Sequence, residues 1–244
     1  MNDIKRKRKQ IILEKCFDQE SNLVEIGIDE AGRGPMLGRV YSAAVILPKD
    51  DSFEHEMMKD SKRFSSEKKI REAAEYIKTN AIKWSVAFSS EDTIDKINIR
   101  NATHKAMHDA VRNVITPDSQ YHLLVDGNDF NPFTTFKNEC LIQVPHTCIE
   151  GGDNKYTAIA AASILAKVAR DDYIADICLE HPELHEKYQI LKNKGYGTKA
   201  HHEGIIEHGI TKFHRKTFGI CRNYSVAEQS DPTNYVEGST KYNK

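Results

Sequence analysis

The sequence of 244 residues has no run of about 20 apolar residues, which is the length that a membrane-spanning helix needs. Its five cysteines form no CxxC pair and are odd in number, so reduced thiols in an intracellular protein are the simplest interpretation. The opening residues, Met1 to Ile4, contain no apolar segment of the kind that begins a secretory signal. We therefore expect a cytoplasmic protein that makes no contact with a membrane.

The chain also has no excess of positive charge, because its formal net charge is −1. A polyanionic ligand such as a nucleic acid would therefore need a local basic patch. Residues 5–9 are five consecutive cations, which would be a solvated arm, a nucleic-acid contact or a nuclear targeting signal. Residues 187–216 contain seven lysines and arginines against two glutamates, and this segment is the better candidate.

The pattern of apolar residues predicts strands that alternate with helices. Val24, Ile26 and Ile28 share one face of a strand expected over residues 23–29. Further strands are expected at 40–47, 82–89, 122–126 and 141–145, and helices at 98–115 and 156–180. This order favours an α/β sheet that is covered by helices on both faces.

The same patterns divide the chain into three parts. Residues 1–20 are expected to form a basic N-terminal arm, and residues 223–244 a polar tail. Residues 21–222 are expected to form one folded domain, because 39% of the chain is hydrophobic and no repeat or long linker interrupts it.

Acidic residues follow two of the predicted strands. Asp29 and Glu30 come at the end of the first strand, and Asp126 ends the strand at 122–126. In α/β sheets, ligands bind at the carboxyl ends of the central strands. A buried acid there should reach solvent or bind a cation, because burying it unpaired is unfavourable. The alternative for Asp126 is a simple Asp-Gly-Asn turn, which is common in loops.

A further acid, Asp153, stands just before the helix expected at 156–180. It would be either the N-terminal cap of that helix or a fourth carboxylate facing the strand ends. Four acids from three converging element ends suit two hard divalent cations, which together can activate a water and stabilise the leaving oxygen of a phosphodiester.

The segment Gly32-Arg33-Gly34 follows the first pair of acids. Glycines allow the backbone to approach a ligand closely, and Arg33 could contact a phosphate with its planar guanidinium group. A lone Gly-Arg-Gly segment is also compatible with an ordinary loop.

Several longer blocks resemble type 2 ribonuclease H (ribonuclease HII). They occur in the family's order over about residues 23 to 219. The blocks are DEAGRGP at 29–35, DSK at 60–62, DKINIRNAT at 95–103, VDG at 125–127, YTAIAAASILAKVARD at 156–171, KGYGTKAH at 194–201 and HRKTF at 214–218.

The resemblance implies a ribonuclease H-like mixed sheet flanked by helices, with a C-terminal helical extension. It implies that two Mg²⁺ or Mn²⁺ ions are held by Asp29, Glu30, Asp126 and Asp153. It further implies that the ribose 2′-hydroxyl at the cut site is read by Gly32, Arg33 and Gly34, with Tyr196 packing on the next sugar. The residues implied to line the groove for the nucleic-acid backbone are Lys62, Asn98, Ser163, Lys167 and Arg170.

The activity implied is that of a monomeric endonuclease acting on RNA–DNA hybrids and on DNA duplexes that contain ribonucleotides. It would cut the RNA strand, or cut 5′ of a single ribonucleotide, leaving 5′-phosphate and 3′-hydroxyl ends. The alternatives are another nuclease of the same fold and a non-catalytic duplex-binding protein. A zinc site at His104 and His108, four residues apart on one predicted helix, is a further alternative.

Overall fold

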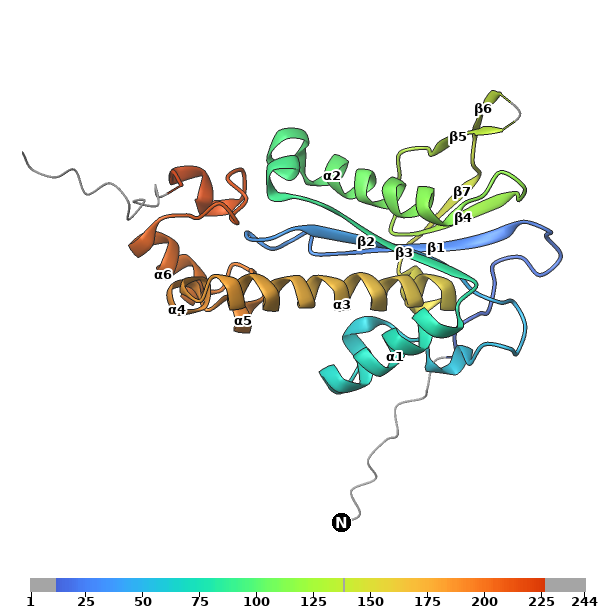
Figure 1. Ribbon diagram of the computed structural model, residues 1–244, viewed down its shortest axis with the longest axis horizontal. Coiled ribbons are helices and arrows are strands. Elements are labelled where there is room, and N and C mark those ends of the chain that lie inside the picture. The colour runs from blue at the N-terminus through green and yellow to red at the C-terminus, as the bar shows by residue number, and fades with distance from the viewer. Residues whose placement is uncertain (1–11, 138, 227–244) are drawn as a thin grey trace, which may run out of the picture.

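The computed structural model describes residues 12–137 and 139–226, and its centre is a five-stranded mixed sheet (Figure 1). The strand order is β3-β2-β1-β4-β7. The strands are β1 (Val24–Ala31), β2 (Val40–Ile46), β3 (Lys83–Ser89), β4 (Tyr121–Asp126) and β7 (His146–Ile149). β1, β4 and β7 run parallel, whereas β2 and β3 are antiparallel to their neighbours. The expectation of a mixed ribonuclease H-like sheet is confirmed.

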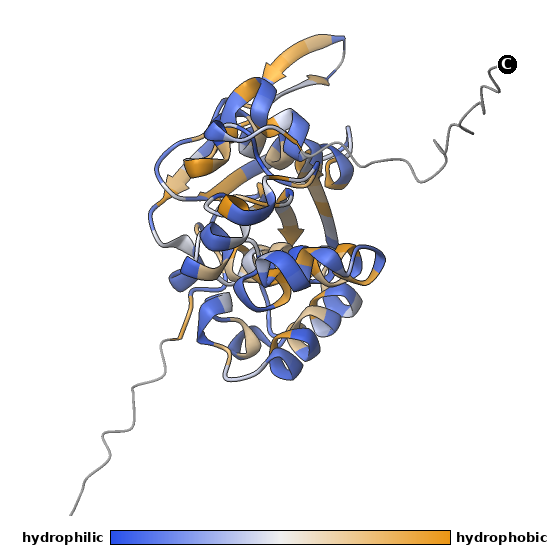
Figure 2. Cartoon of the chain, turned by 90° about the vertical axis from the view of Figure 1, so that its left-hand side faces the viewer, coloured by the Kyte–Doolittle hydropathy of each residue, from blue (hydrophilic) through white to orange (hydrophobic). Residues whose placement is uncertain are grey.

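The two faces of the sheet are covered by two long helices, α2 (Glu91–Val114) and α3 (Thr157–Glu180), as Figure 1 shows. On the α2 face, Ile26 and Ile28 of β1 are fully buried in a cluster that includes Val111. On the α3 face, residues of β2 pack against the alanine-rich first half of α3. The hydropathy colouring in Figure 2 shows hydrophobic strands between helices that are hydrophilic on their outer sides. Every residue of β2 is buried, and all are apolar or aromatic except Ser42, whose hydroxyl donates to the carbonyl of Asp29.

The close contact between β1 and α3 depends on Gly27. A Cβ added there would lie 2.2 Å from the backbone carbonyl carbon of Ala158, closer than any side chain can approach. β1 and α3 therefore touch backbone to backbone at this point, which fixes the height of α3 relative to the end of β1.

Helix α2 begins seven residues earlier than the helix expected at 98–115, because a second helical segment precedes the expected one and joins it at Asn98. Asn98 has a positive φ of 66°, so two helical segments meet there at a kink. Its side chain accepts a hydrogen bond from the backbone N–H of Asn101, which caps the second segment. With a ψ of 163°, this backbone lies outside the left-handed α region, in a region that glycine almost alone adopts, so the kink is strained and the surrounding structure has to hold it.

The C-terminal part forms the helical extension that the resemblance implied. Short helices α4 (Glu183–Tyr188), α5 (Ile190–Asn193) and α6 (Lys199–His208) pack against the second half of α3. A single turn of 3₁₀ helix, η4 (Gly219–Asn223), closes this cluster with the buried thiol of Cys221. A further helix, α1 (Glu67–Asn80), packs against α3 and was not expected from the sequence.

The strand expected at 141–145 is not part of the main sheet. β6 (Cys140–Gln143) pairs instead with β5 (Thr134–Lys137) in a separate hairpin, which stands at the top of Figure 1. Every residue of β6 is exposed, whereas the last strand of the main sheet, β7, begins directly after Pro145.

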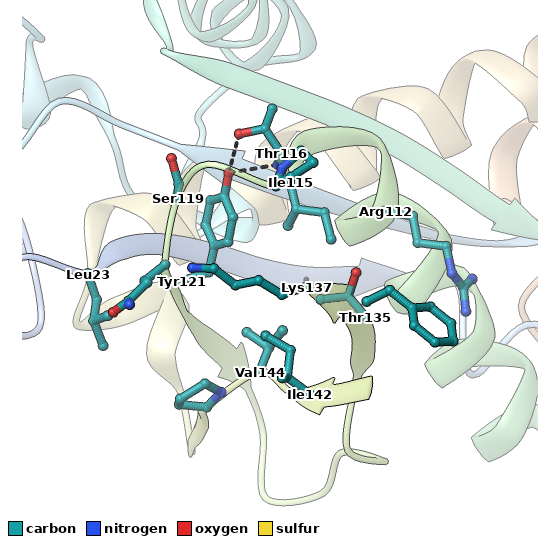
Figure 3. A pocket seen from close by; sticks show the side chains of 14 residues that line it. Leu23, Arg112, Ile115, Thr116, Ser119, Tyr121, Thr135, Lys137, Ile142 and Val144 are labelled. Carbon is teal, nitrogen blue, oxygen red and sulfur yellow. Dashed lines mark hydrogen bonds between the residues drawn. The ribbon is translucent and has the colours of Figure 1, made fainter. Parts of the chain in front are cut away.

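A cavity of about 530 Å³ lies between this hairpin, the end of α2 and the start of β4 (Figure 3). Its lining includes Tyr121, Ile142 and Val144, and contains no acidic residue. The hydroxyl of Tyr121 accepts a hydrogen bond of 2.8 Å from the backbone N–H of Thr116. The cavity lies at the beginning of β4, at the opposite end of that strand from Asp126.

The N-terminal segment lies against the domain wherever it is described. The backbone N–H of Glu14 donates to the carbonyl of Lys155, and the N–H groups of Phe17 and Asp18 donate to the carboxylate of Glu25. Within the expected arm, Leu13 and Cys16 are buried against the domain, whereas residues 17–20 are exposed. The basic run at 5–9 lies outside the described residues. None of the helices in the described segments has the length and apolar content needed to cross a membrane.

Candidate active site

The parallel pairing of β1 and β4 brings the first acids together. Ile28 pairs with Val125, so Asp29 and Asp126 follow at the same edge of the sheet. The backbone N–H of Gly152 donates a 2.6 Å hydrogen bond to the carboxylate of Asp126, which ties the 3₁₀ turn η3 (Gly152–Asn154) to the end of β4. Asp153 belongs to that turn, and the four acids predicted from the sequence therefore meet at one edge.

These acids line one cavity of about 410 Å³. The rest of its lining consists of Ala31, Gly32, Arg33, Gly34, Ser61, Lys62, Ser163, Lys167, Arg170 and Tyr196. Every residue predicted for the site lies in this cavity except one. Asn98 is exposed, caps the kinked helix and does not line the cavity, so the structure does not bring it to the site.

Burial and mutual repulsion act on the acids. Asp29 is only 5% exposed, and its pKa is raised well above the usual range by burial and by the charges of Glu30 and Asp126. Hydrogen bonds from Ser163 and from the backbone N–H of Glu30 offset part of this effect. Burial and the charge of Asp126 also raise the pKa of Glu30 and that of Asp153.

Four cationic side chains line the same cavity, namely Arg33, Lys62, Lys167 and Arg170. Arg33 lies 3.4 Å from Glu30 and lowers its pKa, but it is an exposed side chain. Lys167 is paired with Asp171 at 2.6 Å, which leaves little of its charge for the cavity. The donor set is made of hard carboxylate oxygens that repel one another, which is the chemistry that Mg²⁺ and Mn²⁺ satisfy.

Within the described residues, no three His, Cys, Asp or Glu side chains converge closely enough to surround a single ion. The four acids are spread along the cavity instead. This arrangement fits ions that each take one or two carboxylates and complete their coordination with water and substrate phosphate. The residues therefore fit divalent cations bound with the substrate better than a closed structural metal site.

Local geometry bears on the alternative roles considered for Asp153, Asp126 and His108. Tyr156, and not Asp153, is the N-cap residue of α3, and no side chain caps that helix. Asp126 does precede a turn, since Gly127 has a φ of +98°, yet its carboxylate still lines the cavity. Nε2 of His108 is hydrogen-bonded to the backbone carbonyl of Asn131, so this nitrogen makes a structural contact and is not free to bind zinc.

The loop Gly32–Gly34 is shaped by two buried arginines. Gly32 has a φ of +95°, and a Cβ there would lie 2.3 Å from Nε of Arg170. Arg170 is 2% exposed and donates to the carbonyl of Lys194 at 2.8 Å. Arg215 is fully buried beneath the same loop and donates to its carbonyl groups. Arg215 was missed from the sequence, although it lies within the HRKTF block that resembles the family.

Two other residues near the acids were not predicted. Asp60 accepts from the backbone N–H of Lys62 and raises the pKa of Asp153. Ser61 contacts Ser163 through their hydroxyl oxygens, 3.1 Å apart, and so joins the loop before α1 to α3. The DSK block at 60–62 was the available signal for both residues.

A mixed sheet with carboxylates at the ends of its parallel strands, flanked by long helices and a helical extension, defines a ribonuclease H-like nuclease. The sequence matches the family model Ribonuclease HII over residues 26–221. The chain belongs to the ribonuclease HII family, and is accordingly a metal-dependent endoribonuclease of the ribonuclease H type.

Known relatives cover most of the chain. It is 48% identical over 202 residues to the ribonuclease HII of Parabacteroides distasonis, a match that spans 82% of this chain and 92% of that protein. It is also 48% identical over 198 residues to the ribonuclease HII of Bacteroides fragilis, covering 81% of this chain and 90% of that protein.

Solved structures share the fold at low sequence identity. Ribonuclease H2 from Pyrococcus horikoshii aligns with a TM-score of 0.66 at 20% identity, over 82% of this chain and 96% of that one. The ribonuclease HII in the PCNA complex from Archaeoglobus fulgidus aligns with a TM-score of 0.62 at 21% identity, over 81% and 96%. A Bst ribonuclease HIII in complex with Mn²⁺ aligns with a TM-score of 0.54 at 14% identity, over 78% and 71%.

Proposed function

We propose that this chain hydrolyses the RNA strand of RNA–DNA hybrids and cuts 5′ of single ribonucleotides in duplex DNA, with two Mg²⁺ or Mn²⁺ ions. The ions would be held by Asp29, Glu30, Asp126 and Asp153. The observation that carries this proposal is the meeting, in one cavity, of four acids with the Gly32–Gly34 loop and Tyr196. Membership of the ribonuclease HII family supports the same activity.

The loop and the tyrosine supply the groups needed to recognise a ribose. A Cβ on Gly34 would lie 3.4 Å from Cε1 of Tyr196, so the ring is next to the loop backbone. Tyr196 is 50% exposed, which leaves its ring and hydroxyl available to a nucleic acid. The 2′-hydroxyl is the group that distinguishes RNA from DNA, and backbone amides can bind it without reading the base.

The protein's own part in the reaction is to hold the cations and to orient the substrate. When bound, the two cations would polarise the scissile phosphate, promote attack by water and stabilise the leaving oxygen. The acids fix where these charges lie, and Arg33 and Lys62 at the cavity provide cationic contacts for the phosphates on either side. Hydrolysis on the 5′ side of the ribonucleotide leaves a 5′-phosphate and a 3′-hydroxyl.

The substitution Asp126→Asn tests the metal assignment. A DNA duplex containing one ribonucleotide is incubated with the parent or the variant, in Mg²⁺ or in EDTA. We expect a nick by the parent only in Mg²⁺, and nearly complete loss of turnover in the variant with folding and much duplex binding retained. Asp118→Asn, at an exposed acid away from the cavity, is the matched control and should cut normally. Cutting by Asp126→Asn at the parent rate would refute the assignment.

The substitution Tyr196→Ala tests the recognition of single ribonucleotides. We expect it to reduce cutting at a single ribonucleotide more than cutting of a long hybrid, because a hybrid offers further riboses. Tyr196→Phe keeps the ring and separates stacking from hydrogen bonding. An equal loss on both substrates would count against a role for Tyr196 in sensing the sugar.

We also propose that the chain acts as a monomer in the cytoplasm and that residues 21–222 form the catalytic domain. The pairing of Ile210 with Val226 places the end of the described chain against this domain. Binding to duplexes should weaken as salt is raised, because phosphate contacts release condensed counterions. Sedimentation of the protein with and without a duplex would measure its mass in solution, and a mass of two or more chains would contradict the proposed monomer.

A further inference from the structure

We propose that two consecutive residues, His214 and Arg215, are positioning residues that hold the Gly32–Gly34 loop and Tyr196 at a fixed relative position. The inference rests on the proposed function, because it concerns how the ribose reader is assembled. Neither residue lines the cavity, so neither is expected to touch the nucleic acid.

Arg215 holds the loop from beneath. Its side chain is fully buried, and its guanidinium group donates to three backbone carbonyls. Nη2 lies 2.5 Å from the oxygen of Gly32, Nη1 lies 2.9 Å from that of Arg33, and Nε lies 2.8 Å from that of Gly38. Burial lowers the pKa of Arg215 to about 9, so it stays charged at neutral pH. A buried charge requires these acceptors, which makes the arrangement rigid.

The consequence concerns the amide groups of the loop. The peptide bonds here are trans, so each carbonyl points opposite to the N–H of the following residue. With the carbonyls of Gly32 and Arg33 held by Arg215, the N–H groups of Arg33 and Gly34 point to the other side. Arg33 and Gly34 line the cavity whereas Arg215 does not, so that side is the cavity. Arg215 therefore aims two backbone donors at the position of the ribose.

His214 reaches the tyrosine through a second histidine. The N–H of Thr211 donates to Nδ1 of His214, so the ring proton of His214 is assigned to Nε2. Nε2 of His214 is 3.1 Å from Nε2 of His201, which must then accept. The proton of His201 therefore lies on Nδ1, which donates to the carbonyl of Tyr196 at 3.0 Å. Burial keeps both rings neutral, and the pKa of His214 is lowered to about 3.

The two contacts are joined by the backbone between them. The N–H of Arg215 donates to the carbonyl of Met36 at 2.8 Å, and the N–H of Met36 donates to the carbonyl of Gly195 at 2.9 Å. Leu37 also forms an isolated antiparallel β-bridge with His214. One short segment thus connects the residues that follow the loop with those that precede Tyr196, so the two parts of the reader cannot move independently.

The test compares affinities for two duplexes of the same sequence, one all-DNA and one with a single ribonucleotide. All proteins carry Asp126→Asn, so that the substrate is not consumed, and titrations in Mg²⁺ give the ratio of the two dissociation constants. Arg215→Lys keeps the charge but cannot reach three carbonyls. We expect it to reduce the preference for the ribonucleotide by about tenfold, equivalent to about 1.4 kcal/mol, with the affinity for all-DNA unchanged.

Arg222→Lys is the matched control, because Arg222 is an exposed arginine of the same segment that donates to Thr217 and does not touch the loop. It should keep the parent ratio. A purely structural role for Arg215 would lower the fraction of active protein and weaken both affinities equally. An unchanged ratio in Arg215→Lys would therefore overturn the proposal.

His201 tests the second connection. His201→Asn keeps a donor near the position of Nδ1 and should retain most of the preference, whereas His201→Leu should lose it. Equal behaviour of the two variants would overturn the role of the histidine pair. If the Asp126→Asn parent itself binds both duplexes equally, the proposed ribose reader fails at once, which is a different result from a preference that the variants leave intact.

Discussion

Replacing Asp29 with Asn should make the metal-free protein more stable while abolishing its activity. Asp29 is buried, and the charges of Glu30 and Asp126 raise its pKa along with burial. Asparagine has nearly the same shape and keeps an oxygen to accept the 2.7 Å hydrogen bond from the N–H of Glu30. The change therefore removes the repulsion and the desolvated charge without opening a cavity. We expect a gain of about 0.5–2 kcal/mol, which is the range that single stabilising substitutions commonly give.

The gain should depend on pH in a defined direction. Because the pKa of Asp29 is higher in the folded than in the unfolded protein, the wild-type chain loses stability as pH rises from the unfolded value of about 4 through the folded value. Below that window the carboxyl is protonated in both states and the variant gains nothing. The difference should grow as pH rises above the unfolded value and level off once the folded value is passed, and each kcal/mol of it should raise the melting temperature by about 2–4 °C.

Thermal unfolding in EDTA and in Mg²⁺ measures this effect. In EDTA at neutral pH the variant should have a higher melting temperature than the wild type. In Mg²⁺ this difference should become smaller or change sign, because bound cations stabilise only a folded protein that can ligate them. Asp129→Asn is the control, since Arg100 lowers the pKa of Asp129 and its loss should not stabilise. A variant that melts below the wild type in EDTA would show that Asp29 is not a repelled, buried charge.

Two further substitutions test the fold that positions the site. Gly27→Ala places a Cβ 2.2 Å from the backbone of Ala158, so we expect a loss of about 1–3 kcal/mol in urea unfolding and reduced nicking, because Asp29 must move with β1. Ser66→Ala removes the side chain that caps α1 by accepting from Lys69, and should lower stability by about 1 kcal/mol with activity unchanged. The neighbouring Ser65→Ala should leave both unaltered, and equal effects of the two serine variants would contradict the capping role.

Local patterns predicted most of the elements because they depend on residues that are near in sequence. The alternation of Ile26 and Ile28 with Gly27 marked β1, and the apolar run before Asp126 marked β4. The boundaries were less accurate where one residue decided them. Asn98 ends one helical segment and begins the next through its backbone conformation, which no periodicity of apolar residues reveals. The strand expected at 141–145 became part of a hairpin, because pairing partners are chosen by the tertiary fold.

The sequence by itself determined which acids were candidates, since Asp29, Glu30 and Asp126 follow strands and Asp153 precedes a helix. It also determined the family, through long blocks whose order and spacing are specific. The tertiary structure alone decided that Asp153 lines the cavity and caps no helix, and that Asn98 lies outside the cavity. It also decided that Arg215 supports the loop, although 182 positions separate it from Arg33 in the sequence. The reason is physical: helix and strand periodicity record local burial, whereas a buried guanidinium finds its carbonyl partners only after distant segments have packed together.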